Sequence, residues 1–440
     1  MDFNKLLNAA KEKGITDIEV YERVSEAISV ETFNSKIDKN TVENSTEIYV
    51  RGVYNNHIAA IYVENDSDDE IENIIKRLIE NAKVIESNDP YFIYEGDKDY
   101  PKLEEKENDF DEYSLDDLAN LCIKYENEFK AKCPNIVNSK SVIEIYGNYV
   151  SIKNSNGLNV NKKSRNAVFV IQTMIKVEND VKTGFAFQYL NNIKDIDKEK
   201  AYKFAVERPL SSIGAKSYRS SQYPVIFENK VASSLIATFS SMFSAEVVLK
   251  KVSPLQDKIG TDVFGKNITI TDEPLNKISF NQTPFDDEGV KAFNKEVVKD
   301  GKLVTYLHNL KTAKMMNTKS TGNGFKDRSG NIAVSISNLC FKTSNISFDD
   351  MIKDIKEGIY ITSIQGLHAG ANSVSGAFNL QSSGYVIRDG KIAEAVTLII
   401  VSGNFIDMLN DIKCISNDFE INSNVGTGSI LVNSLSVSGK

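Results

Sequence analysis

The chain has 440 residues, of which 41% are hydrophobic and 26% are charged, and its formal net charge is −9. This composition is ordinary for a globular protein, and the length predicts two or more domains with hydrophobic cores of their own. An acidic chain without a basic cluster does not suit direct binding to nucleic acid, because phosphate recognition needs a basic patch.

The sequence favours a cytoplasmic location. The first residues, MDFNKLLNAAKEKG, lack the continuous apolar segment of a signal peptide. Apolar runs such as 398–401 are far too short to span a bilayer. Cysteines occur without a CxxC pair, at Cys122, Cys133, Cys340 and Cys414, which is typical of free thiols in a reducing compartment.

The N-terminal stretch alternates between helical and strand patterns. Residues 2–13 predict a short helix, and strands are expected at 17–23, 27–33 and 47–54, with a hairpin turn at Asn55-Asn56. An apolar stripe over 64–85 predicts the clearest helix of the chain. The acids at its start, Asp66, Asp68, Asp69 and Glu70, are interpreted as helix-capping residues at the positive end of the dipole rather than as a metal site.

The remainder of the N-terminal half continues this mixture. A polar surface loop is expected at 95–112, and helices are expected at 115–130 and near 197–208. Strands are expected at 137–146, 149–154 and 167–177, with a turn at Asn156-Gly157. These patterns predict one α+β domain over residues 1–215, an antiparallel sheet with helices on one face.

The C-terminal half is expected to be built around the segment 225–260. Val225–Phe227 predicts a short strand, which leads into a helix that ends before Pro254. Leu235, Phe239 and Met242 repeat at spacings of three and four, so this helix should bury one stripe in the core. It carries no His and no Cys, which leaves a central core helix without catalytic chemistry.

Beyond this helix the pattern is mostly β. Short strands are expected at 268–271, 303–310, 331–337, 358–363, 384–388 and 395–401. The pairs Asp300-Gly301 and Asp389-Gly390 predict hairpins. We therefore expect a second domain over residues 220–440, mostly β and barrel-like with one core helix, which makes the whole chain α+β.

Histidine is rare in this chain. His57 lies beside a hairpin turn and is expected to be an exposed strand residue, whereas His308 alternates within VTYLHNL and is expected to be structural. His368 lies in QGLHAGANSVSG, where glycines leave backbone amides accessible. The loop could hold an extended peptide or its carboxylate through Gly366, His368, Gly370, Asn372, Ser375 and Gly376. A glycine-rich turn that merely needs unusual backbone angles explains the spacing equally well.

The other candidate motifs are weak. Asp286, Asp287 and Glu288 are adjacent, so their side chains should point in different directions and favour a loop motif over a shared metal. The stretch 319–330 lacks the spacing of a phosphate-binding loop, and no GxSxG nucleophile motif is present. The residues alone therefore give no catalytic constellation.

Several stretches together resemble the TldD/PmbA family, once named modulators of DNA gyrase, and specifically its TldE (PmbA) branch. The matching stretches are VSPLQDKIG (252–260), PFDDEGV (284–290), and the segments 301–324, 365–392 and 401–418. The N-terminal EVYERVSEAISVETFNSKI and VRGVYNNHIAAIYVEND also fit, so the resemblance covers nearly the whole chain.

The resemblance implies a two-part zinc peptidase in which the TldD-type chain carries an HExxxH helix and a later Cys ligand. On this chain the HExxxH window would fall roughly on Ala237 to Met242, where Ala237, Thr238 and Met242 cannot replace the ligands and the glutamate base. No Cys follows Cys414. We expect an undistorted core helix here, with no metal, no cofactor and no catalytic residue on this chain.

The resemblance then implies a non-catalytic subunit that works with a zinc-bearing TldD-like partner on unfolded peptides or peptide precursors. The chain alone is expected to be inactive, with homodimers possible and the C-terminal half forming the contact. The alternative is a stand-alone homodimeric peptide-binding or regulatory protein without catalysis. A weaker possibility is an independent hydrolase that uses His368 and the acids at 286–288.

Overall fold

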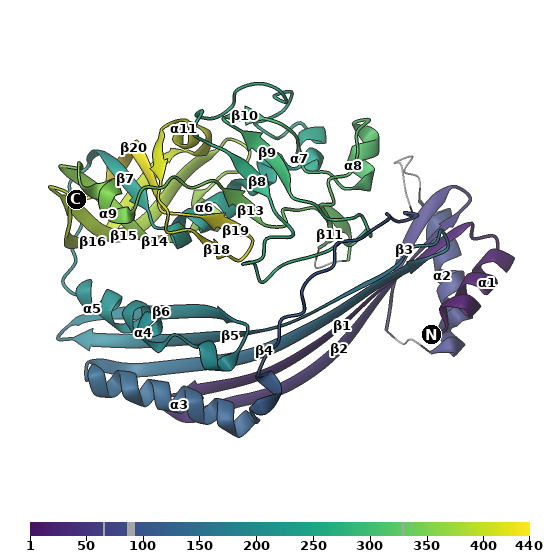
Figure 1. The fold of residues 1–440 in the computed structure, drawn as a ribbon, viewed down its shortest axis with the longest axis horizontal. Coiled ribbons are helices and arrows are strands. Elements are labelled where there is room, and N and C mark those ends of the chain that lie inside the picture. The colour runs from purple at the N-terminus through teal and green to yellow at the C-terminus, as the bar shows by residue number, and fades with distance from the viewer. Residues whose placement is uncertain (65–66, 86–92, 328–329) are drawn as a thin grey trace. The chain divides into compact units, whose positions relative to one another are not determined.

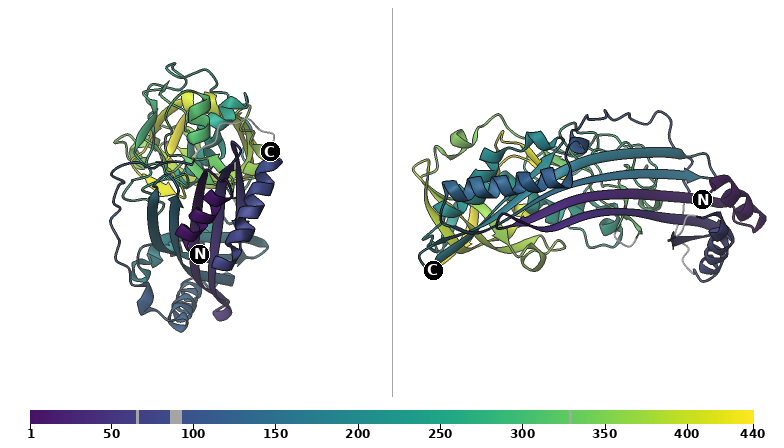
Figure 2. Two further views of the ribbon diagram at one scale, coloured as in Figure 1. Left: turned by 90° about the vertical axis from the view of Figure 1, so that its right-hand side faces the viewer. Right: turned by 90° about the horizontal axis from the view of Figure 1, so that it is seen from below.

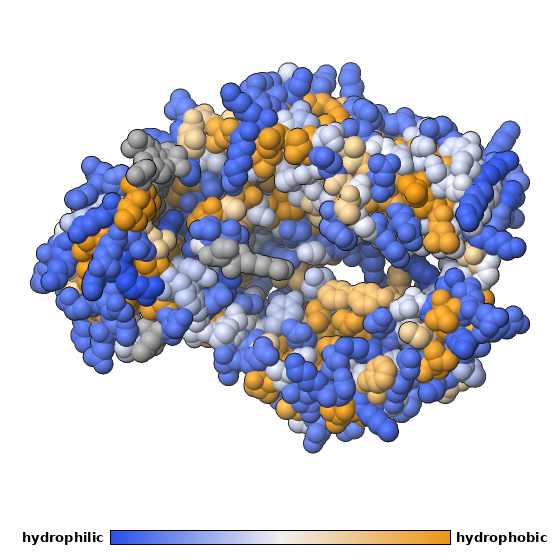
Figure 3. Space-filling model, turned by 180° about the vertical axis from the view of Figure 1, so that it is seen from behind, coloured by the Kyte–Doolittle hydropathy of each residue, from blue (hydrophilic) through white to orange (hydrophobic). Residues whose placement is uncertain are grey.

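The computed structural model describes residues 1–64, 67–85, 93–327 and 330–440 (Figure 1). The chain forms two compact units, an N-terminal unit of residues 1–88 and 104–214 and a C-terminal unit of residues 89–103 and 215–440. Both mix helices and strands, which confirms the predicted α+β class. Among the helices of the described ranges, none is long and apolar enough to cross a membrane. Hydrophilic residues cover much of the face shown in Figure 3, between smaller apolar groups.

A six-stranded antiparallel sheet is the frame of the N-terminal unit (Figure 2). In spatial order its strands are β3 (His57–Val63), β2 (Lys36–Tyr54), β1 (Asp17–Phe33), β4 (Ile136–Asn154), β5 (Asn159–Val177) and β6 (Asp180–Leu190). The strands predicted at 17–23 and 27–33 are thus one strand. Polar residues interrupt its apolar alternation, but the pairing with β2 continues through them, for example where Ser25 lies opposite Ser45.

Helices cover one face of this sheet, as predicted. The helices α1 (Phe3–Glu12) and α2 (Ile71–Lys83) share a core with β1, β2 and β3. A second core unites α3 (Leu115–Lys132) and α4 (Lys198–Tyr202) with the strands β4, β5 and β6. Along β1, Ile18 contributes to the first core and Val30 to the second. Their even spacing puts both side chains on the same side of the strand.

The acids before α2 are not hydrogen-bonded caps. Asp66 lies outside the described residues, and neither the 3₁₀ turn Asp68–Glu70 nor α2 has a side-chain cap in the part of the chain that the structure describes. Asp68 instead accepts hydrogen bonds from the amide of Asp2 at 2.7 Å and from Lys5 Nζ at 2.6 Å. The prediction that these acids cap the helix by hydrogen bonds was therefore wrong for Asp68. Its side chain instead connects α1 to the start of α2.

The helix predicted near 197–208 is interrupted by a π-helical turn. It consists of α4, the π turn Lys203–Glu207 and α5 (Arg208–Ser211). The Thr173 hydroxyl on β5 donates to the carbonyl oxygen of Ala205 in that turn. The same carbonyl lies against Gly184 of β6, where a Cβ atom would collide with it. The π turn thus directs a backbone carbonyl onto the sheet, which the sequence pattern could not reveal.

A closed five-stranded barrel is the centre of the C-terminal unit and confirms the barrel-like prediction. Its strands in spatial order are β16 (Lys391–Asn404), β15 (Ala377–Arg388), β14 (Glu357–Gln365), β7 (Ser221–Phe227) and β20 (Ile430–Ser438). Pairing of β16 with β20 closes the ring, and β17 (Ile412–Ile415) adds to β20. A second sheet contains β8 (Ile270–Asp272), β9 (Lys295–Lys299), β10 (Lys302–Leu303), β13 (Leu339–Phe341), β18 (Glu420–Asn422) and β19 (Val425–Thr427).

Alternation along the barrel strands separates two cores. On β7, Val225 and Phe227 contribute to the large core that includes α6 (Asn229–Phe239). Ile226, between them, belongs to a smaller core on the opposite side, together with Met351 and Ile352 of α9 (Phe348–Ile352). One face of the barrel strands therefore packs on α6 and the other on α9.

The predicted hairpins at Asp300-Gly301 and Asp389-Gly390 are confirmed, and all four of these residues have positive φ. The predicted strand at 303–310 is wrong, because β10 ends at Leu303 and α8 (Leu310–Met315) begins where the strand should continue. Asn309 and Thr312 form a reciprocal capping box at this helix start. Residues 306–309 are all buried in a loop before this helix, so the alternation in VTYLHNL does not mark a strand with one buried face.

Candidate functional site

Helix α6 is a core helix, as predicted, and its apolar stripe is fully buried. Leu235 and Phe239 are at most 1% exposed, and both pack with the barrel interior. Phe239 stacks on Phe405 with ring centroids 4.5 Å apart, and it meets Phe378 edge-on. Aromatic and aliphatic contacts of this kind account for its burial without any polar partner.

The prediction of an undistorted helix through residue 242 is wrong. The α-helix ends at Phe239, a 3₁₀ segment runs over Ser240–Phe243, and α7 (Ala245–Leu249) follows. The Ser240 hydroxyl donates to the carbonyl of Ala237 at 2.8 Å, and the Ser253 hydroxyl donates to that of Met242 at 2.7 Å. Serine hydroxyls thus donate to carbonyls that would accept hydrogen bonds from backbone amides if the α-helix continued.

This break separates the two ends of the 237–242 window. Ala237 is exposed, whereas Met242 is completely buried in the large core. Thr238, between them, turns its hydroxyl back to the carbonyl of Ser234 at 2.9 Å. The window thus presents a methyl group to the surface and a thioether to the core, so its ends do not converge on one point.

The last cysteine also lies away from this window. Cys414 of β17 packs against the core of Ile226, Met351 and Leu431, on the opposite side of the barrel strands from α6. Burial raises the pKa of its thiol, whereas a zinc ligand must be a thiolate. In the described residues no three His, Cys, Asp or Glu side chains are gathered as a metal site. Whether the chain binds zinc stays a prediction.

The loop 366–376 has a defined backbone that uses most of its own polar groups. Gly366 has φ near 77° and precedes α10 (Leu367–Gly370), whose last amide donates to the carbonyl of Gly366 at 2.7 Å. Asn372 Oδ1 accepts hydrogen bonds from the amides of Val374 and Ser375, each at 3.0 Å. The amide of Gly376 donates to the carbonyl of Asn372 at 2.8 Å. The amides of Gly370 and Gly376 are therefore already occupied within the loop.

Exposed and buried residues of this loop have different roles. His368, Asn372 and Ser375 are exposed, while Gly376 is buried. At Gly376 a Cβ atom would approach Asn404 Oδ1 to 2.9 Å, and at Gly370 it would collide with the carbonyl of Asn379. These two glycines are thus required by close packing, whereas His368, Asn372 and Ser375 have exposed side chains that can reach a ligand.

The structure places one end of the loop beside the 237–242 window. The carbonyl of Gly376 accepts a hydrogen bond from the amide of Phe405 at 2.7 Å, and Phe405 stacks on Phe239. Asn404 Nδ2 donates to the carbonyl of Ser375 at 2.8 Å. Two sequence candidates that are far apart in the chain are therefore linked through residues 404 and 405, by hydrogen bonds on the loop side and by the Phe405–Phe239 ring stack on the window side.

The acids at 286–288 form a buried turn instead of a metal site. Asp286 is completely buried, and its Oδ1 accepts from the amides of Glu288 at 3.0 Å and Val290 at 2.9 Å. Its Oδ2 accepts from the amide of Gly324 at 2.9 Å. Burial, with the nearby Glu288 carboxylate, raises the pKa of Asp286. The expected loop motif is thus a turn whose centre is a carboxylate surrounded by backbone amides.

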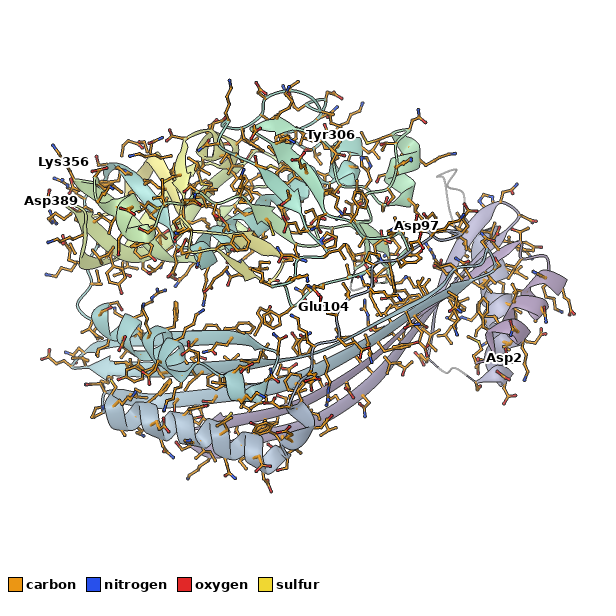
Figure 4. The ribbon with its side chains drawn as sticks, viewed as in Figure 1. Asp2, Asp97, Glu104, Tyr306, Lys356 and Asp389 are labelled. Carbon is orange, nitrogen blue, oxygen red and sulfur yellow. The ribbon has the colours of Figure 1, made fainter. Side chains whose placement is uncertain are left out.

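The two neighbouring acids anchor other segments to this turn. Asp287 Oδ2 accepts from the amide of Lys326 at 2.9 Å, and Glu288 Oε2 accepts from the amide of Leu310 at 2.8 Å. The segment 93–103 also contacts this turn through Asp97, which is labelled in Figure 4. Its Oδ2 accepts a hydrogen bond from the amide of Lys291 at 2.8 Å. The stretch 319–330, expected to be a plain loop, therefore supplies backbone donors to Asp286 and Asp287.

A buried ion pair that sequence reasoning missed continues this network. Lys295 Nζ of β9 lies 3.2 Å from Asp272 Oδ2 of β8, and both residues are at most 8% exposed. The same ammonium donates to the carbonyl of Thr321 at 2.6 Å and to Asn323 Oδ1 at 3.0 Å. Burial lowers the pKa of Lys295. The partners come from distant stretches, so no local motif signalled the pair.

His308 is buried beside this network, which is compatible with the structural role expected for it. Its backbone carbonyl accepts from Thr321, and its side chain is 2% exposed. Burial lowers the pKa of the imidazole to about 4, so the ring is neutral near pH 7. Its Nδ1 has no hydrogen-bond partner in the described part of the chain. His57, expected to be exposed, is half-buried at the start of β3.

Known protein families match both ends of the chain. Residues 220–439 match the PmbA/TldA metallopeptidase C-terminal domain, and residues 18–82 match PmbA/TldA metallopeptidase domain 1. A metalloprotease PmbA homolog of Buchnera aphidicola is 26% identical over 69% of this chain and 65% of its own length. The metalloprotease PmbA of Escherichia coli O157:H7 is 29% identical over 53% of this chain and 49% of its own. The match thus spans about half to two thirds of these relatives.

Solved structures agree over nearly the whole chain. A Thermotoga maritima protein, described as a proposed modulator of a DNA gyrase, superposes with a TM-score of 0.90 at 29% identity, covering 99% of both chains. TldE from Thermococcus kodakarensis superposes with a TM-score of 0.89 at 21% identity, covering 99% of this chain and 100% of that one. The second likeness shows a shared fold.

Proposed function

The chain belongs to the TldD/PmbA metallopeptidase family, and from this premise we propose that it is a TldE-like, non-catalytic subunit of a two-part zinc peptidase. The observation that carries the proposal is the 237–242 window, where an exposed alanine and a buried methionine stand at the two ends. Neither side chain can bind zinc, and the helix break points them apart.

Zinc hydrolysis needs about three protein ligands and an open position for water. In this chain Asp286, one of the acids considered for a general base, accepts hydrogen bonds from backbone amides in a buried turn. This side chain is completely buried and its oxygens are occupied by backbone amides, so it is poorly placed to take a proton from an attacking water. These features support a subunit whose contribution is shape rather than chemistry.

We infer that the contribution is one wall of a channel for unfolded peptide. The 366–376 loop supports this role because its backbone is held by its own bonds while His368, Asn372 and Ser375 remain exposed. A rigid loop loses little conformational entropy when an extended peptide binds to it. The zinc would then belong to a TldD-like partner, in contact with the C-terminal half of this chain, in the cytoplasm.

The test is a pull-down of the tagged full chain from its native cell, followed by identification of captured chains and zinc analysis of the complex. The proposal expects a co-purifying chain with an HExxxH helix, and zinc in proportion to that chain. A captured complex without such a chain would favour the stand-alone homodimer. Zinc in proportion to the tagged chain alone would contradict the proposed role.

A further inference from the structure

The N-terminal sheet has a long edge that no other strand covers in the part of the chain that the structure describes. Strand β2 has 19 residues, but β3 pairs only with its section from Ile48 to Tyr54. The section 36–47 pairs with β1 on one side and runs along the outside of the sheet (Figure 1). An open edge presents unpaired amides and carbonyls, which are a template for another strand.

Most of this edge is regular enough to accept a strand. The one irregularity in the pairing with β1 lies near the hairpin tip, where Thr32 is opposite Ile37 and Glu31 is opposite Lys39. From Lys39 onward the pairing is continuous, and the section contains no proline. Val42, at its middle, leaves 59% of its surface exposed. Neither a bulge nor a proline blocks the edge between Lys39 and Glu47.

The charges along the edge are arranged asymmetrically. Lys39 stands at one end of the regular section, and Glu43 and Glu47 stand toward the other. Glu47 lies 3.6 Å from Arg23 in an exposed pair, whereas Lys39 and Glu43 enter no ion pair within the described ranges. An antiparallel copy of the same edge reverses this order, so each Lys39 would meet the acidic end of the other strand.

We propose that the β2 edge pairs antiparallel with the β2 edge of a second copy of this chain. With the two-fold axis at Val42, the two Val42 side chains lie opposite each other and shield their apolar surface. Lys39 then lies diagonally between Glu43 and Glu47 of the second copy. A shift by two residues in either direction puts it directly opposite one of these acids, so the attraction does not depend on one register.

The occupant is a second copy rather than an arbitrary peptide because opposite charges outnumber like charges when the edge meets itself: each Lys39 lies diagonal to two acids of the other strand, whereas the one like-charged diagonal contact is between the two Glu43 side chains. An unfolded peptide of unrelated sequence would satisfy the backbone groups but not this order of one Lys and two Glu. The surface also differs from the C-terminal half, which is proposed to contact a TldD-like chain. The edge would therefore join two subunits, or two complexes, through one continuous sheet.

The test is sedimentation equilibrium of the full chain, compared with Lys39→Glu, Glu43→Lys and the exposed control Lys153→Glu on β4. The wild type should dimerise in a concentration-dependent manner. Each β2 variant faces like charges across the two-fold axis and should dimerise about tenfold more weakly, because two symmetric contacts are lost. Lys153→Glu makes the same charge change away from the edge and should behave as the wild type.

The decisive arm is an equimolar mixture of Lys39→Glu and Glu43→Lys, which restores opposite charges between unlike chains. A labelled chain should then show heterodimers that are at least about tenfold more stable than either variant's homodimer. A wild type that stays monomeric, or that binds an extended peptide along β2 without self-association, would overturn the proposal. So would a dimer that both variants leave unchanged.

Discussion

Two regions of the C-terminal unit differ in their ionisable groups: the 237–242 window has none, whereas the network around Asp272, Asp286 and Lys295 buries several. The 237–242 window lies where the resemblance implies zinc ligands, yet it contains no ionisable side chain, and Phe239 and Met242 are fully buried. The network around Asp272, Asp286 and Lys295 is charged, yet its carboxylates accept bonds from amides and from one ammonium. The charged groups of this network thus hold loops together, whereas the 237–242 window has no ionisable group and buries only Phe239 and Met242 in the core.

The largest change in the free energy of unfolding is expected when the buried ion pair between Lys295 and Asp272 is broken. Replacing Lys295 by Met leaves Asp272 buried without its ammonium and should lower the free energy of unfolding by about 4 kcal/mol. Chemical denaturation measures the change. Lys299→Met, on the same strand but in an exposed pair with Glu296, is the matched control and should cost less than about 1 kcal/mol.

If the Lys295→Met chain simply fails to fold, the double variant Asp272→Asn with Lys295→Met should recover part of the stability, because no unpaired charge remains. Equal small losses for Lys295→Met and Lys299→Met would show that the network is not structural and would reopen it as a functional site.

The next test compares the two ends of the 237–242 window. Met242→His puts a polar ring into the large core and should cost about 3 kcal/mol, whereas Ala237→His is exposed and should cost less than about 0.5 kcal/mol. Thermal and denaturant unfolding of both variants check the contrast. A double variant that binds zinc tightly while keeping wild-type stability would mean that the two positions do converge.

The buried His308 predicts a pH dependence of stability. Its pKa is about 4 in the folded chain and near 6.5 when unfolded, so only the unfolded chain takes up a proton between these values. Stability contributed by the neutral ring is thus present above pH 6.5 and lost as the pH falls toward 4, by about 3 kcal/mol. His308→Gln should show a correspondingly smaller loss over that window. Parallel curves for the two proteins would contradict this assignment.

The smallest effect on stability is expected at the loop. His368 is exposed, so His368→Ala should change the free energy of unfolding by less than about 0.5 kcal/mol while slowing peptide processing by the assembled complex. Gly370→Val should damage the fold as well, since a side chain there collides with the carbonyl of Asn379. Unchanged turnover of His368→Ala at subsaturating peptide would remove the loop from the binding surface.

Local chemistry made part of the fold predictable. The turn pairs at Asn55-Asn56 and Asp389-Gly390 demand positive φ, and the chain turns there. The helix break after Phe239 was not predictable from periodicity, since it depends on serine hydroxyls that bind carbonyls, one of them from Ser253 in a later loop. The buried network could not be predicted from the sequence, because Asp272, Lys295 and Asn323 are far apart in the chain and contact one another only after folding.

Zinc analysis and a peptidase assay of the purified full chain alone test directly whether this subunit lacks catalysis of its own. We predict no stoichiometric zinc and no cleavage of an unfolded peptide, because the 237–242 window offers neither imidazole nor carboxylate. Near-unit zinc together with EDTA-sensitive peptidase activity in a homogeneous preparation would contradict it.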